Sequence, residues 1–111
     1  MGDLLELTGR WWDWQVDLWD GSAFRLIADN DLTYHHSVEV TFTAVVWVSS
    51  ADLFHHPVFR LPTHAEREFA RQVATDEGHH LFAWDAETAT GTVPMMVVAH
   101  AAQVVEGIVR H

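Results

Sequence analysis

The chain of 111 residues has no cysteine, so disulfide bonds and thiolate metal sites are excluded. Basic residues are also scarce: six Lys and Arg stand against 16 Asp and Glu, which gives a formal net charge of −10. Nucleic acids and anionic membranes attract proteins through positive charge, so neither partner is expected. The acidic balance serves solubility, and it also allows a basic protein partner.

Long apolar runs are missing as well. The longest runs, residues 44–48 and 94–99, are far short of the ~20 apolar residues that span a bilayer. The first residues lack the basic start and apolar run of a signal peptide, so we expect a cytoplasmic protein. Because 49% of the residues are hydrophobic and six are Trp, we expect one packed domain over residues 1–111.

Tryptophan is concentrated near the start of the chain. Alternating apolar and polar residues predict a strand over residues 10–19, followed by a second strand that begins near Phe24. The first strand has a predicted core face with four members: Trp12, Trp14, Val16 and Leu18. A three-residue loop, 20–22, would pair Leu18 with Phe24 and set Asp17 across from Arg25, an opposite-charge pair. The two segments therefore predict a β-hairpin.

Further strands are predicted along the chain. Residues 37–48 give the longest signal, with a bulge or break near Thr43 and Ala44. Residues 58–61 form a short extended piece, which Pro57 and Pro62 should keep short or at a sheet edge. Residues 80–85 alternate as a strand does. Residues 95–110 fit either one helix or two strands, 95–99 and 104–109. Their β-branched residues and Gly107 favour the strands.

One helix is predicted over residues 63–77. Thr63 and Glu66 form a capping box, and Gly78 is placed to end the helix. Its single apolar stripe indicates that it packs against a sheet. The whole pattern predicts an α+β fold: a mostly antiparallel sheet of about six or seven strands with one amphipathic helix packed on a face.

Histidine is abundant, but its spacing matches no metal or catalytic motif. The nine His include three adjacent pairs, and neighbouring residues of a strand point to opposite faces. No nucleophile elbow, glycine-rich phosphate loop or H-E-x-x-H motif is present, so we assign no catalytic residue and no cofactor, and expect an enzyme less than a binding protein. A small-molecule or metal site, or a small enzyme, remains the alternative, and it would use four residues: Tyr34, His36, His56 and His80.

The outward tryptophans give the main functional hypothesis. Trp11 and Trp19 lie on the face of the first strand opposite its core face, and Trp47 joins them on the long strand if no bulge intervenes. Exposed Trp is enriched in binding hot spots, so these three residues predict a surface for a protein partner or for a homo-oligomer. Loops or the last strands could instead cover them.

A resemblance points the same way. The runs WWDWQVDLWDGSAFRLIADNDLTYHH, FHHPVFRLPT and VVAHAAQVVEGIVRH resemble small uncharacterised β-rich proteins of high-GC actinobacteria. In layout the chain is similar to the immunity proteins of bacterial polymorphic toxin systems, which are small acidic cytoplasmic domains with a meander of strands and one helix. The resemblance implies a non-catalytic protein-binding module and carries over no functional residue.

Overall fold

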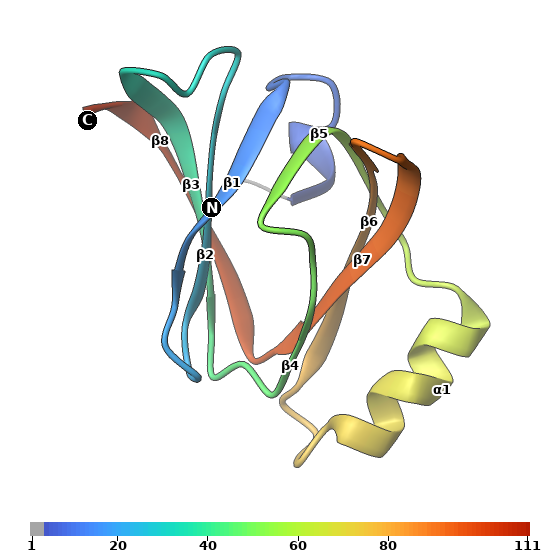
Figure 1. Ribbon diagram of the computed structural model, residues 1–111. Helices are drawn as coiled ribbons and strands as arrows, with labels where there is room; N and C mark the ends of the chain where they lie inside the picture. Colours follow the sequence, from blue (N-terminus) through green and yellow to red (C-terminus); the bar gives the residue numbers. More distant parts are fainter. Residues whose placement is uncertain (1–3) are drawn as a thin grey trace.

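The computed structural model describes residues 4–111, which form eight strands in one antiparallel sheet, one α-helix and a short 3-10 helix (Figure 1). The elements are η1 (Leu4–Leu7), β1 (Asp13–Trp19), β2 (Phe24–Asp29), β3 (His35–Thr43), β4 (Trp47–Ser49), β5 (Leu53–Arg60), α1 (His64–Val73), β6 (His80–Thr88), β7 (Gly91–Ala99) and β8 (Ala101–Arg110). The α+β class is confirmed, but the sheet has eight strands rather than six or seven. The predicted strand 37–48 is divided at Ala44, whose φ of 50° breaks the ladder at the expected place.

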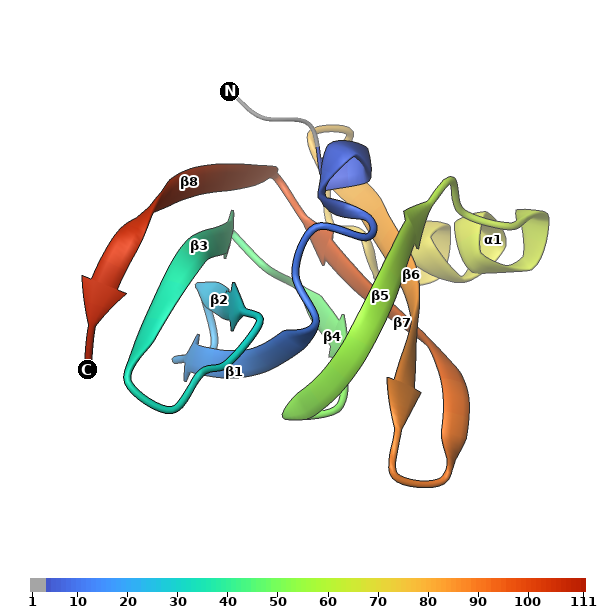
Figure 2. The same cartoon turned by 90° about the horizontal axis from the view of Figure 1, so that it is seen from above.

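The sheet curls until the β3–β4 corner meets the β7–β8 corner. Its strand order is β4-β7-β6-β5-β1-β2-β3-β8, yet β3 leads directly into β4 and β7 leads directly into β8. Backbone hydrogen bonds join these corners: the N–H of His100 donates to the carbonyl of Thr43 at 3.0 Å, and that of Val46 donates to Val98 at 2.9 Å. Figure 2 looks down on the curl, with β8 and the pair β6 and β7 on opposite sides. The sheet therefore encloses its own core.

Two fully buried tryptophans fill the centre of this core. Trp14 stacks on Phe54 with ring centroids 6.1 Å apart, and its indole N–H donates to the carbonyl of Trp11 at 3.1 Å. Trp84 lies 5.9 Å from Phe54 and 5.7 Å from Phe59. These aromatic contacts link β1, β5 and β6 across the interior. Within residues 4–111, no helix is long and apolar enough to cross a membrane.

The first hairpin departs from the prediction in its loop. Trp19, and not Leu18, pairs with Phe24, so the loop has four residues, 20–23. The carboxylate of Asp20 stabilises this loop by accepting the backbone N–H groups of Ser22 and Ala23 at 2.9 and 2.8 Å. The prediction of a three-residue loop was wrong because alternation of apolar and polar residues does not reveal the side-chain hydrogen bonds that stabilise a longer loop.

A β-bulge in β1 changes the register of this hairpin partway along its length. The pairing shifts between Val16 and Leu18, which leaves Asp17 outside the ladder. The predicted ion pair nevertheless forms: the Arg25 guanidinium lies 2.7 Å from the Asp17 carboxylate. The core assignment of Trp12 was wrong. Trp12 precedes β1, remains 54% exposed and contacts the His56 ring at a centroid distance of 6.0 Å.

The middle strand is longer than predicted. β5 runs through Pro57 and lies between β6 and β1, in the interior of the sheet rather than at an edge. Its register with β6 shifts between His55 and Val58, and His56 has a φ of 49°. Pro57 is tolerated because it lies in this bulge, where no ladder hydrogen bond is required of it. In the last part of the chain β7 and β8 confirm the two-strand reading.

The helix begins as predicted and ends early. Thr63 is its N-cap, and the reciprocal bonds with Glu66 complete the capping box. The helix stops at Val73 rather than at residue 77, since Ala74 is already extended and the chain turns toward β6. Gly78 therefore does not cap it. The helix packs on the outside of the sheet, where Phe69 meets the edge of the Trp47 ring with centroids 4.9 Å apart.

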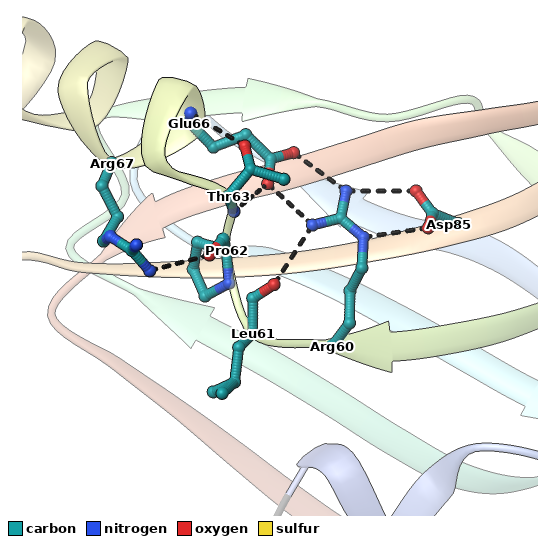
Figure 3. A network of polar contacts seen from close by, with 7 residues as sticks. All are labelled: Arg60, Leu61, Pro62, Thr63, Glu66, Arg67 and Asp85. Carbon is teal, nitrogen blue, oxygen red and sulfur yellow. Dashed lines mark hydrogen bonds and ion pairs between the residues drawn. The ribbon is translucent and has the colours of Figure 1, made fainter.

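A single arginine fastens the start of the helix to the sheet (Figure 3). Arg60, at the end of β5, binds both oxygens of Glu66 at 2.7 and 2.9 Å and both oxygens of Asp85 at 2.9 and 3.1 Å. Hydrogen bonds to Glu66, which have the larger effect, and to Asp85 raise the pKa of Arg60. The bond from Arg60 lowers the pKa of Glu66 to about 2, against the opposing effect of burial. This two-sided clamp joins α1 to both β5 and β6.

Candidate functional site

The most accessible part of the sheet is its edge strand β8. It pairs with β3 on one side, and among residues 4–111 no strand pairs with its other side. Two of its apolar side chains, Val105 and Ile108, are 49% and 72% exposed. A long edge strand with apolar side chains presents free backbone N–H and C=O groups to another chain. β8 can therefore accept a further strand.

The regular part of this edge is Ala101 to Glu106. These residues pair one-to-one with Thr43 to Val38, and the ladder is then interrupted by a bulge before Val109 meets His36. Gly107 lies in the bulge with a φ of 156°, a conformation that other residues rarely adopt. A bulge twists an edge strand, so strand addition is favoured along the six regular residues and discouraged beyond them.

An apolar pocket lies beside this regular stretch. Its volume is about 420 Å³, within the range of small binding cavities. Ala102 and Val104 form its β8 wall, and Phe82 of β6 and Phe59 of β5 lie on the other side. η1 contributes Leu4 to the same lining. The pocket is thus positioned to take an apolar side chain from a chain that lies along β8.

Among the described residues that line this pocket, Arg60 is the one that carries a charge. Its five N–H donors are all engaged, by Glu66, by Asp85 and by the carbonyl of Leu61 at 3.3 Å. No donor is left for an anionic ligand. The pocket therefore offers apolar contact, and the arginine serves to hold its wall.

The three tryptophans proposed as partner anchors lie apart in the fold. Trp11 is half-buried and packs against the core. Trp19, at the end of β1, is 48% exposed with its ring edge toward Phe24. Trp47 is 40% exposed and carries the contact with the helix residue Phe69. None is fully buried, so the anchor hypothesis stays a prediction, but the three are held by different neighbours.

The four residues proposed for a ligand or metal site are distributed over three strands and a loop. Tyr34 precedes β3 with its ring exposed, and His56 lies in the β5 bulge. His80 begins β6 opposite Ala99. His36 is buried and has both ring nitrogens occupied, by Glu39 at 3.0 Å and by His111 at 2.8 Å. Over the described residues, these four do not form a group of metal-ligating side chains.

Sequence reasoning missed two features. One is the free edge of β8, whose signal is an apolar pattern on both faces, with Val104 and Val105 adjacent. The other is a group formed by Asp76, His79 and His100, whose members are spread over 25 positions and carry no recognisable spacing. In both cases the information lies in the strand order, which places β8 at an edge and brings the β7–β8 corner toward the loop after α1.

A scan against protein-family models finds no match. Searches of curated proteins and of solved structures find no match either. The function must therefore come from the chemistry of the residues described above.

Proposed function

We propose that this protein is a non-catalytic binding module that takes an extended segment of a basic partner protein onto the free edge of β8. The observation that carries the proposal is the regular stretch from Ala101 to Glu106, which lies next to an apolar pocket and whose outer side pairs with no strand within residues 4–111. In this mode of recognition the main-chain hydrogen bonds provide affinity, and a pocket for alternate side chains provides specificity.

Charge selects the kind of partner. The chain carries a formal charge of −10, so a basic segment is attracted during the encounter and an acidic one is repelled. A second copy of this chain carries the same −10 and is disfavoured on the same ground. The bulge at Gly107 further shortens the edge that two copies could share. A role like that of an immunity protein, which binds and blocks a toxin, is consistent with this mode of binding.

The pocket defines what the bound segment must contain. Alternate residues of a strand point to the same face, so one apolar side chain of the segment would enter beside Ala102 and Val104. Its neighbours would face outward, where lysine or arginine meets the acidic surface. The preferred segment therefore alternates an apolar anchor with basic residues.

A displayed library of random twelve-residue peptides tests this proposal. We expect the selected peptides to alternate apolar and basic residues and to shift the backbone NMR signals of 101–106. Val105→Lys places a charge on the edge, and Ala102→Trp fills the pocket, so each should weaken the binding of a selected peptide by about tenfold or more. Val93→Lys changes an exposed side chain of β7, away from this edge; it is the matched control and should leave affinity unchanged.

Three results would overturn the proposal. They are a library that yields no enriched peptide, shifts that lie away from β8, and equal weakening by Val93→Lys. Sedimentation equilibrium tests whether the chain forms a homo-oligomer. A dimer that Val105→Lys dissociates would show that a second copy occupies the edge instead.

A further inference from the structure

Three metal-ligating side chains meet where the loop after α1 approaches the corner between β7 and β8. The Nε2 atom of His100 lies 3.1 and 3.2 Å from the two carboxylate oxygens of Asp76. Nδ1 of His79 lies 3.5 Å from the Asp76 Oδ1 atom, and the two imidazole rings have centroids 4.3 Å apart. One ligand atom from each residue falls within 4.8 Å of the others.

The surrounding backbone holds this group in place. The N–H of Gly78 donates to Asp76 Oδ1 at 2.7 Å, and the backbone N–H of His100 is fixed by Thr43 at 3.0 Å. The His79 side chain is only 3% exposed, which restricts its rotamers. Ligands that are oriented by such outer hydrogen bonds bind a metal with less loss of conformational freedom.

Gly78 also leaves the space that the group requires. A Cβ atom at this position would lie 3.1 Å from Asp76 Oδ1 and 3.5 Å from His100 Nε2. Any larger residue would therefore crowd the Asp76 ligand atom and make ordinary contact with that of His100. This offers a way to disturb the group without removing a ligand.

The geometry points to a binding site for a divalent ion of the zinc class, held by Asp76, His79 and His100 with a fourth position open to solvent. Zinc bonds of roughly 2.0 to 2.1 Å in a tetrahedron place ligand atoms about 3.3 Å apart, and the two separations to Asp76 Oδ1 are 3.1 and 3.5 Å. Two imidazoles and one carboxylate are the donors such ions accept. Asp76 and His100 are exposed enough to leave the fourth position to water.

One competing interaction has to give way. The Nδ1 lone pair of His79 accepts the backbone N–H groups of Thr75 and Asp76, both at 3.3 Å. These are long bonds, and a metal ion would replace them with one short coordinate bond. The N–H groups also mark Nδ1 as unprotonated, which is the state a ligand needs.

Titration with Co²⁺ followed by visible absorption, and with Zn²⁺ by calorimetry, tests this site. We expect one ion per chain, with a dissociation constant of about 10 μM or tighter. His100→Gln and Asp76→Asn should each weaken binding by about 100-fold. His64→Gln, on the exposed face of α1, and His80→Gln, beside the site but outside it, are the matched controls and should bind as the parent does.

Gly78→Ala provides the sharper variant because it keeps all three ligands. It should weaken binding by about tenfold while circular dichroism shows an unchanged fold. The site is refuted if the parent chain binds no Co²⁺, or if His64→Gln or His80→Gln lowers binding as much as His100→Gln does. Zinc binding that survives both His100→Gln and Gly78→Ala would also refute it.

Discussion

The two edge strands of the sheet are protected very differently. β4 has only three residues, and the helix α1 packs next to it through the contact between Trp47 and Phe69. β8 has ten residues, and its exposed side chains include Val105 and Ile108. Short strands and covering helices are the usual means of blunting a sheet edge. Edge strand β4 is protected by both means, and β8 by neither. The β4 side of the sheet therefore contributes to the stability of the fold, while β8 is left accessible.

This difference implies that equal substitutions have unequal effects at the two edges. Near the helix, truncating a side chain removes contacts between α1 and the sheet, so the free energy of unfolding should fall. The outward side chains of β8, such as Val105 and Ile108, are largely exposed, so their removal should leave stability unchanged while binding changes.

The largest expected effect is at the clamp that fastens the helix. Arg60→Leu leaves the carboxylates of Glu66 and Asp85 without their partner, and should lower the free energy of unfolding by about 3 kcal/mol. Arg110→Leu, on β8, is the matched control. Arg110 forms no ion pair within residues 4–111, so this variant should change stability by less than about 0.5 kcal/mol. Urea denaturation measures both, and equal losses would contradict the comparison.

Acid should weaken the clamp that joins the helix to the sheet. The bond from Arg60 holds the pKa of Glu66 at about 2, below its ordinary 4.5. As pH falls, the unfolded chain takes up this proton before the folded chain does. The stabilisation is therefore complete above pH 4.5 and is lost as pH falls toward 2.

Glu66→Gln isolates this contribution. Relative to the parent, it should cost about 2 kcal/mol of unfolding free energy at pH 7 and almost nothing at pH 2. Glu106→Gln, on the free edge strand, should change stability by less than about 0.5 kcal/mol at pH 7. Denaturation curves over this pH range provide the measurement, and a pH-independent difference for Glu66→Gln would argue against the clamp.

A smaller effect is expected from the aromatic contact on β4. Trp47→Ala removes the edge-to-face packing on Phe69 and should cost about 1.5 kcal/mol, since the ring is partly exposed already. Ile108→Ala removes a large apolar side chain from β8 and should cost less than about 0.5 kcal/mol. Thermal unfolding followed by circular dichroism distinguishes them, and the reverse order would mean that β8 is covered in solution.

Local chemistry explains what the sequence predicted correctly. The capping box at Thr63 and Glu66 depends on residues three apart, and the break at Ala44 follows from a change in alternation. The division of the last segment into β7 and β8 follows from β-branched residues and Gly107. Each of these signals is contained in a few neighbouring residues.

The errors arise where the structure of a segment depends on residues far away in the sequence. Trp12 was assigned to the core because it continues the alternation, but β1 begins only at Asp13. Pro57 suggested an edge, while pairing with β1 and β6 carries β5 through it. The ligand group formed by Asp76 and His100 likewise joins residues 24 positions apart. No periodic pattern reports which loops the strand order brings together.

The pairing of β3 with β8 also implies a delay during synthesis, because the two strands lie far apart in the sequence. His36 and His111, which touch in the folded chain, are separated by 75 residues. β3 therefore leaves the ribosome long before the strand that covers it, and its own edge stays open for that interval. Pairings of such long range form slowly, and an open apolar strand can meet other nascent chains meanwhile. The strand that ends as the free edge of the native sheet is the one that closes this earlier exposure.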